Sequence, residues 1–280
     1  MARLLFGTAG TPHSAETEST VGGIERVSEL GLGCMEIEFV QRVQMSEATA
    51  LKVAECAART GIKLTVHAPY YINLNAREPE KVRASQARLL KAARVGAVCG
   101  ASSVAVHVAF YMGDPPERTY DTVKRHLVEV LEELEADGSQ VWVRPELMGK
   151  PSQFGDLEEI LGLSVELERV APCIDFAHYH ARTGGHNSYR EFTAMLARIE
   201  ERLGRAALED MHIHVAGIAY GPRGERKHLD LEESDLAYVE LMQALRDYDV
   251  GGVVVCESPN LEEDALLLQK TYLGLTHHAA

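Results

Sequence analysis

The sequence predicts a single closed (β/α)8 barrel, also called a TIM barrel, formed by the whole chain, residues 1–280. Three observations predict this fold. Apolar stretches typical of strands alternate eight times with stretches of helical periodicity. The length of 280 residues is typical of one such barrel. Six of the apolar stretches also run into a histidine, aspartate or glutamate, and a parallel barrel gathers the carboxyl ends of its strands at one mouth.

The expected strands are short apolar stretches, several of them rich in β-branched residues. They comprise residues 3–7, 35–40, 62–66, 103–106, 141–143, 170–174, 210–215 and 252–255. An open, doubly wound sheet is the alternative arrangement of these strands. It would spread the polar strand ends along a crevice instead of around a ring.

The expected helices carry apolar residues at helical spacing. They comprise residues 21–30, 47–60, 80–98, 121–137, 157–163, 189–203, 234–248 and 261–273. Ser46 and Asp156 are suited to cap the second and fifth of these helices, because a side-chain oxygen can accept a hydrogen bond from the first turn. Gly138 is suited to end the fourth helix.

Composition and charge restrict the functional classes. No apolar run reaches the roughly 18 residues that a membrane span needs, so we expect no membrane partner. The five cysteines form no CxxC pair, which favours free thiols in a reducing cytoplasm. The formal net charge of −14 argues against broad electrostatic binding of nucleic acid, although it does not exclude a nucleic-acid enzyme with a local basic rim.

Metal-ligating side chains follow the expected strands at regular places. The strand ends carry, in chain order, His67, His107, Glu146, Asp175, His212 and Glu257. His178 follows Asp175 by three residues, and His228 lies in the long loop after the seventh strand. Imidazole and carboxylate together suit zinc, manganese or iron, and carboxylates can bridge two ions. Because such groups are costly at a half-buried mouth without cations, the sequence predicts a metal centre.

Several stretches resemble the motifs of a known family. Residues 67–74 (HAPYYINL) are close to its HAPYxINL stretch, and residues 173–178 (CIDFAH) are similar to its CIDxxH motif. Met211-His212 resembles its MHLND strand end, and residues 257–259 (ESP) resemble its ETP. By these motifs the chain resembles endonuclease IV, the second family of apurinic/apyrimidinic (AP) endonucleases, within the xylose isomerase-like barrels. Residues 145–155 are similar to its shorter, archaeal-type members.

The resemblance implies a metal-dependent endonuclease that cuts DNA on the 5′ side of abasic sites. It implies two or three zinc ions, with manganese or iron as alternatives. The first ion would be bound by His67, His107 and Glu146. Glu146 would bridge to the second ion, whose ligands would be completed by Asp175, His212 and Glu257. His178 and His228 would help to bind the third. Glu146 and Glu257 would be the catalytic residues, the latter as a proton acceptor.

The chain departs from the family pattern at the third ion. The family uses an Asp-x-His pair there, but Arg226 stands two residues before His228 and cannot ligate a metal. Glu225 or Asp230 could substitute for the missing carboxylate. His214 replaces an expected amide two residues after His212, on the same side of the strand. It is suited either to support a metal ligand or to be a buried structural histidine.

The resemblance also places DNA contacts in loops at the mouth. Gln41 and Arg42 follow the second strand, where the family places side chains that enter the duplex. Tyr70 and Tyr71 follow His67 and could wedge into a stack left open at an abasic gap. Phosphate contacts are expected from Lys150, Arg182, Arg223, Arg226 and Lys227. The expected partner is therefore DNA with abasic sites, bound by a monomer.

Two other functions stay open from the sequence. One is a metal-dependent sugar isomerase or epimerase on the same barrel, which would need only the second-ion ligands Glu146, Asp175, His212 and Glu257. The acidic charge and the altered third site favour this alternative, whereas the additional histidines favour the nuclease. The other is a metal-binding barrel without catalytic activity that serves as an interaction module.

Overall fold

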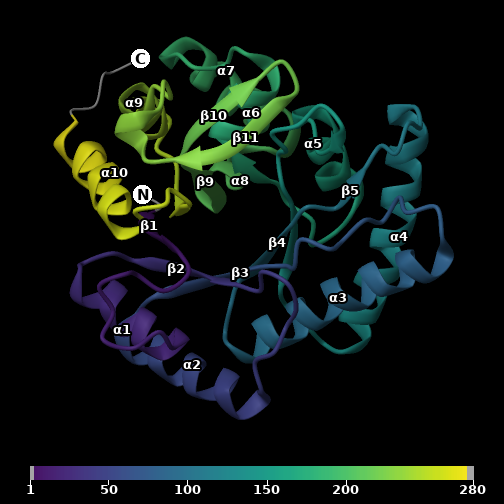
Figure 1. Cartoon of the computed structure of the whole chain (residues 1–280), viewed down its shortest axis with the longest axis horizontal. Coiled ribbons are helices and arrows are strands. Elements are labelled where there is room, and N and C mark those ends of the chain that lie inside the picture. The colour runs from purple at the N-terminus through teal and green to yellow at the C-terminus, as the bar shows by residue number, and fades with distance from the viewer. Residues whose placement is uncertain (1–2, 276–280) are drawn as a thin grey trace.

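Eight parallel strands form the centre of this structure, a computed structural model that describes residues 3–275 (Figure 1). They are β1 (Leu4–Ala9), β2 (Cys34–Glu38), β3 (Lys63–His67), β4 (Ser103–Val106), β6 (Trp142–Pro145), β8 (Cys173–Asp175), β9 (Met211–Val215) and β12 (Gly252–Cys256). The sheet order is β6-β4-β3-β2-β1-β12-β9-β8, and every pairing is parallel. Parallel bridges from Val143 to Val170 and from Glu146 to Cys173 join the two edge strands. The predicted (β/α)8 barrel is confirmed.

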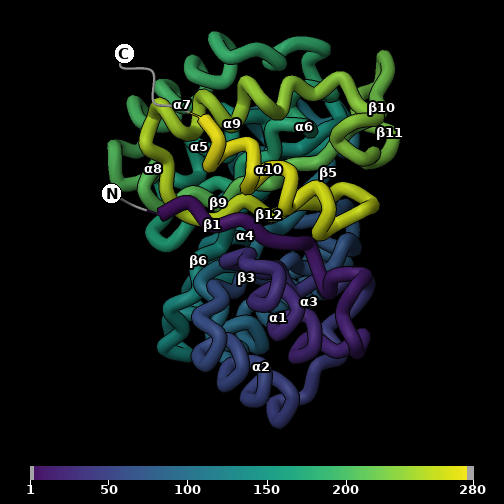
Figure 2. Tube along the Cα trace, turned by 90° about the vertical axis from the view of Figure 1, so that its left-hand side faces the viewer, coloured from purple at the N-terminus to yellow at the C-terminus, as the bar shows by residue number. Residues whose placement is uncertain are grey.

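The helices lie outside the strands, as Figures 1 and 2 show. They are α1 (Thr20–Glu29), α2 (Glu47–Thr60), α3 (Pro79–Val98), α4 (Pro116–Ala136), α5 (Leu157–Glu166), α6 (Phe176–Thr183), α7 (Tyr189–Leu203), α8 (Arg205–Glu209), α9 (Tyr238–Asp247) and α10 (Glu262–Gly274), with a 3-10 turn η1 (Leu231–Glu233). Among residues 3–275, no helix combines the length and the apolar character that crossing a bilayer requires.

Local sequence explains where these helices begin. Ser46 caps α2 by accepting a hydrogen bond from the Thr49 amide, and Asp156 caps α5 as part of a capping box with Glu159. Helix α4 begins five residues before its predicted start, because Pro116 fits the first turn, where no amide donor is needed. Helix α9 begins at 238 instead of 234, because η1 and an extended segment precede it.

Two short antiparallel pairs were not predicted from the sequence. Strands β5 (Ala109–Phe110) and β7 (Gln153–Phe154) pair with each other, as do β10 (Gly217–Gly221) and β11 (Gly224–Leu229). The β10–β11 hairpin lies against α6 (Figure 1). Both pairs follow carboxyl ends of barrel strands, so they extend the mouth at which the predicted site residues gather.

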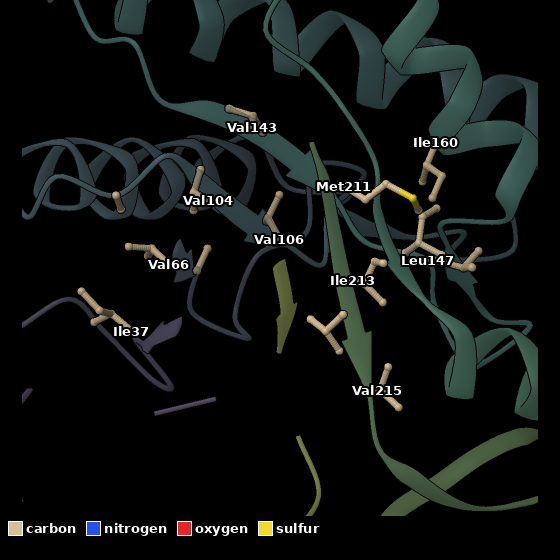
Figure 3. Close-up of a cluster of buried hydrophobic side chains, with 14 of the residues drawn as sticks. Ile37, Val66, Val104, Val106, Val143, Leu147, Ile160, Met211, Ile213 and Val215 are labelled. Atoms are coloured by element: carbon tan, nitrogen blue, oxygen red, sulfur yellow. The ribbon is translucent and has the colours of Figure 1, made fainter. Parts of the chain in front are cut away.

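The strands alternate between an apolar and a polar face. Figure 3 shows Ile37, Val66, Val104 and Ile213 in a cluster of buried hydrophobic side chains. Val66 packs against α3, where a Cβ atom on Gly96 would lie 3.0 Å from its Cγ2. Because neighbouring strand residues point to opposite faces, the intervening residues turn to the barrel interior. The interior therefore receives the histidines and carboxylates of these strands.

Candidate metal centre

Glu146 lies at the centre of the mouth, with 1% of its surface exposed, among four imidazole rings. Its Oε2 atom lies 3.0 Å from His67 Nε2 and 3.0 Å from His107 Nε2. Its Oε1 atom lies 3.1 Å from His178 Nδ1 and 3.6 Å from His214 Nδ1. The two oxygens thus face different sets of nitrogens. This is the arrangement that a carboxylate needs to bridge two cations.

A group of four potential ligands lies on the Oε1 side of Glu146. One ligand atom each from Glu146, Asp175, His214 and Glu257 lies within 4.8 Å of all the others. Glu146 Oε1, Asp175 Oδ2 and His214 Nδ1 are buried without a hydrogen bond. Buried polar atoms normally have a partner, so these lone pairs fit a divalent cation.

The Oε2 side of Glu146 offers two further imidazole nitrogens. The His67 and His107 rings meet edge to face, with 5.0 Å between their centroids, and both direct Nε2 toward Glu146. His67 Nδ1 lies 2.8 Å from the carbonyl oxygen of Ala68, to which it can donate its proton. This hydrogen bond fixes the ring and leaves Nε2 facing the position that a metal would take.

A third group lies between α6 and β11. His178 Nε2 and His228 Nε2 are 3.3 Å apart, and Glu225 Oε2 lies 3.7 Å from His178 Nε2. Two neutral imidazole nitrogens at this distance can share one proton or one cation. His178, Glu225 and His228 therefore fit an additional cation of the kind expected for the third site.

A β-bulge explains how Glu225 reaches this group. Residues three apart on a regular strand point to opposite faces. In the hairpin, however, Ala219 pairs with Lys227 and Tyr220 with Glu225, so Arg226 is an extra residue on β11. The extra residue brings Glu225 to the same face as His228, whereas Arg226 is exposed.

The other carboxylate considered for this position, Asp230, has a different role. Its Oδ1 accepts a hydrogen bond from the Asn260 amide. Gly149 makes the room that Glu225 needs, because a Cβ atom there would lie 2.7 Å from Glu225 Cβ and 3.1 Å from His178 Cδ2. The structure thus brings Glu225, not Asp230, to the two histidines.

His212 is the one predicted ligand that the structure does not bring to the mouth. It is the second residue of β9 and lies deeper in the barrel. Its Nε2 is 2.8 Å from Glu36 Oε2, and its Nδ1 is 3.2 Å from Ser103 Oγ. His214, two residues further along the same strand face, takes the place at the mouth. Glu36 Oε1 lies 2.9 Å from His214 Nε2 and so helps to orient the imidazole ring of His214.

The four residues expected to contact DNA lie on one side of the mouth. Gln41 and Arg42 are exposed after β2. Tyr70 and Tyr71 are 51% and 64% exposed, and the Tyr70 ring lies 5.9 Å from that of His107. The backbone amide of Tyr70 donates to Val40 O, which holds the two loops together. Tyr70 thus stands beside the candidate ligands His67 and His107.

Arg182, by contrast, is held within the protein. Its guanidinium donates to the carbonyl oxygens of Lys150 and Gln153 at 2.6 and 3.0 Å. Only 9% of its side chain is exposed. It therefore fixes the loop after β6, and its guanidinium binds these carbonyl oxygens instead of the phosphate expected from the sequence.

The buried carboxylates at the mouth favour the binding of positive charge, either as protons or as metal ions. Burial alone would raise the pKa of Glu146, but the charge of His107 and the imidazole nitrogens that face its two oxygens hold it well below its usual value. Burial disfavours charged imidazole, yet the neighbouring carboxylates raise the pKa of His67 and of His178 to about 10. Burial raises the pKa of Asp175 to about 6. Without metal, protons on His67 and His178 supply the positive charge that cations would supply.

A cavity of about 340 Å³ opens onto these groups. Its lining combines ligand residues such as His67, His178 and Glu257 with Tyr70 and Lys150. The site therefore has space for a polar ligand next to the candidate ligands of each of the three groups.

Comparison with known proteins identifies the family of this chain. A sequence profile described as the xylose isomerase-like TIM barrel matches residues 24–271. The chain belongs to the xylose isomerase-like TIM barrel family. An uncharacterized protein of Methanocaldococcus jannaschii is 46% identical over 270 residues, which cover 96% of this chain and 97% of the relative. A probable endonuclease 4 of Mycoplasma pneumoniae is 25% identical over 225 residues, covering 78% of this chain and 75% of that protein.

Two solved structures of other proteins are similar to this xylose isomerase-like barrel. Endonuclease IV from Thermus thermophilus has a TM-score of 0.73 and 21% identity, covering 95% of this chain and 97% of that one. A D-tagatose 3-epimerase-like protein has a TM-score of 0.72 and 19% identity, covering 91% and 94%. At these identities the likeness shows the shared fold alone, so the choice between activities depends on the site.

Proposed function

We propose that this protein is a metal-dependent endonuclease that hydrolyses the DNA phosphodiester on the 5′ side of abasic sites. The observation that carries the proposal is the group of His178, Glu225 and His228 beside the two groups that share Glu146. An isomerase or epimerase would need one set of ligands only. Phosphodiester hydrolysis benefits from several cations, because one can activate the attacking water while another stabilises the negative charge that develops on the leaving oxygen. The 25% identity to a probable endonuclease 4 supports the same activity.

Zinc fits the mixed imidazole and carboxylate ligands, with manganese or iron as alternatives. One ion would be bound by His67, His107 and Glu146. A second would be bound by Glu146, Asp175, His214 and Glu257. A third would be bound by His178, Glu225 and His228. When bound, such ions supply Lewis acidity toward water and toward a phosphodiester.

Glu146 and Glu257 are the catalytic residues of this proposal. Glu146 connects the first two ligand groups through its two oxygens. Glu257 lies between the second and third groups, with Oε1 3.4 Å from His214 Nδ1 and Oε2 3.8 Å from His228 Nδ1. At this place its carboxylate accepts the proton that water loses as it attacks phosphorus. Tyr70 and Tyr71 bind in the gap that the missing base leaves in the duplex.

The test uses purified full-length protein whose metal content has been measured. A duplex with a single tetrahydrofuran abasic analogue is incubated with the protein, with and without EDTA. We expect two or three ions per chain and incision directly 5′ to the analogue. EDTA should abolish incision, added zinc or manganese should restore it, and an undamaged duplex should stay intact. Protein that carries at least two ions and leaves the analogue intact would reject the proposal.

An epimerase or isomerase is the second candidate, because Glu146, Asp175, His214 and Glu257 form a complete set of ligands for one ion. The net charge of −14 also suits a neutral sugar better than a polyanion. Incubation of the same protein with D-tagatose and other ketohexoses tests this candidate. Interconversion of ketoses by protein with one ion per chain would favour it over the endonuclease.

A further inference from the structure

A second cavity, of about 410 Å³, adjoins the metal cavity between the loop after β6 and the turn of the β10–β11 hairpin. Its lining includes Lys150, Ser152, Arg223, Glu225 and Arg226, and Lys150 and Glu225 also line the metal cavity. We propose that this cavity binds a phosphoryl group of the substrate, separate from the group that reacts in the metal cavity. We call it the phosphoryl pocket.

The charge of the phosphoryl pocket points to an anion. It contains three cationic side chains and one carboxylate. Lys150 Nζ lies 3.9 Å from Glu225 Oε2, the oxygen that also faces His178. Within residues 3–275, no carboxylate lies within 4.0 Å of the guanidinium of Arg223 or Arg226. Guanidinium groups bind phosphate oxygens through paired N–H donors, so an excess of them in a chain of net charge −14 indicates a phosphate ligand.

The walls of the pocket are fixed before a ligand arrives. Arg182 donates to the carbonyl oxygens of Lys150 and Gln153, and the Gln153 amide donates to Lys150 O at 2.9 Å. The Glu225 amide donates to Gly149 O at 3.0 Å and ties β11 to the same loop. A ligand therefore meets an ordered site, which reduces the entropic cost of binding.

The β-bulge directs the Arg226 side chain to this pocket. As the extra residue of β11, Arg226 does not share the inward face of Glu225 and His228. Its guanidinium lies over the hairpin turn, where a Cβ atom on Gly221 would be 2.6 Å from Nη2. One local feature thus supplies a carboxylate to the metal group and a cation to the pocket.

The ligand carries a phosphoryl group next to its reacting group, because the two cavities share Lys150 and Glu225. A DNA strand supplies this chemistry as a neighbouring phosphodiester, and a sugar phosphate supplies it as a monoester. The proposed endonuclease function makes DNA the source. The proposed phosphoryl pocket does not depend on whether the substrate is DNA or a sugar phosphate.

The test compares wild-type protein with the double variant Arg223→Ala/Arg226→Ala. The matched control, Lys52→Ala/Lys91→Ala, removes the same charge from exposed positions on α2 and α3. Binding of a fluorescein-labelled duplex with one tetrahydrofuran site is followed by anisotropy at several salt concentrations. We expect the pocket variant to bind at least about tenfold more weakly, with a slope of log Kd against log salt that is smaller by about 1. The control variant should stay within about threefold, and all three proteins should carry equal metal.

A second probe separates the sources of the phosphoryl group. Binding of D-fructose 6-phosphate and of D-fructose is measured with the same three proteins. One outcome would support the phosphoryl pocket and reject the endonuclease function. In it, D-fructose 6-phosphate binds the wild-type protein at least about tenfold more tightly than D-fructose does, and the variant without Arg223 and Arg226 loses this difference. Abasic DNA is neither bound nor cut. If abasic DNA is cut but the pocket and control variants bind every probe equally, the phosphoryl pocket is rejected and the endonuclease function stands.

Discussion

Buried charged groups are paired differently at the two ends of the barrel. At the amino-terminal end, Arg144 is 6% exposed and lies 3.1 Å from Asp210, which also pairs with Lys63 at 2.6 Å. Among the buried side-chain atoms of these three residues, only Arg144 Nε lacks a hydrogen bond. At the carboxyl-terminal end, Glu146 and His214 are among several residues that leave buried atoms without hydrogen bonds. Buried charge at the amino-terminal end is paired within the protein, whereas the carboxyl-terminal end leaves ligand atoms that are suited to bind added cations.

This difference separates stability from function within one fold. A cation paired by carboxylate and carbonyl groups contributes to folding, and its removal destabilises the protein. Unsatisfied ligand atoms contribute little to folding without metal, since protons must fill the places of the ions. Changes at the mouth should therefore alter metal content and activity, and changes at the opposite end should alter stability alone.

The strongest test of the comparison is Glu146→Gln. The amide keeps the shape but loses the charge that two ligand groups share, so both ions should bind poorly. We expect incision at an abasic analogue to fall about 10⁴-fold, equivalent to several kcal/mol of transition-state stabilisation. Metal content should fall by at least one ion per chain. Wild-type activity in this variant would show that the groups around Glu146 do not form the catalytic centre.

The next largest effect is expected from His214→Ala, with His212→Ala as its partner. His214 Nδ1 faces Glu146 and Glu257, whereas His212 contacts Glu36 and Ser103. We expect zinc affinity, measured by competition with a chromophoric chelator, to fall more than about 100-fold for His214→Ala. His212→Ala should cost about tenfold, as is typical of residues that support a ligand. The reverse order would assign the ligand role to His212.

The pH dependence of metal binding should reveal the protons that metal ions displace from His67 and His178. Neighbouring carboxylates raise the pKa of His67 and His178 to about 10, although burial opposes this. In metal-free protein, the stabilisation from their protonated forms is fully present below about pH 6.5 and is lost as the pH rises through about 10. Zinc needs neutral imidazole, and the two rings belong to different ligand groups, so the apparent affinity of the first and of the third ion should each rise about tenfold per pH unit between these values. Calorimetry at pH 8 in two buffers of different ionisation enthalpy should detect about two protons released, and fewer than one would contradict the assignment.

Arg144→Met tests the opposite end of the barrel. The guanidinium donates to Pro172 O and Asp210 O at 3.2 and 2.9 Å, and methionine preserves most of its volume without these bonds. We expect urea denaturation of the metal-free protein to show about 2 kcal/mol less stability. Incision per folded molecule should stay unchanged. A loss of activity in fully folded protein would mean that the two ends are coupled.

The sequence was sufficient to predict the barrel because strand and helix periodicities are local. It was not sufficient to choose between His212 and His214. Both residues point to the barrel interior, and only the register of β9 against β12 sets their depth. In that register His214 lies opposite Val255, two residues before Glu257, and His212 lies one layer deeper, opposite Val253. Register depends on the whole sheet, so a motif alone does not reveal it.

The hairpin at the mouth shows a second limit of sequence-based prediction. Period-two alternation would turn Glu225 away from His228. Only the pairing of Tyr220 with Glu225 shows that Arg226 is an extra residue and that the carboxylate faces inward. A glycine-proline turn signal is present at residues 221–222, but nothing in the local sequence fixes the position of a bulge.

The smallest expected effect concerns the third metal group alone. In Gly149→Ala, the new Cβ atom would lie 2.7 Å from Glu225 Cβ and 2.9 Å from its Oε2, so the carboxylate must move away from His178. We expect one fewer ion per chain, about tenfold slower incision and an unchanged unfolding midpoint in EDTA. Gly185→Ala is the matched control, because its nearest contact would be 3.7 Å from Glu191 Oε1. If both variants keep full metal content, the third group does not bind an ion, and the mouth then differs from the opposite end only through the groups around Glu146.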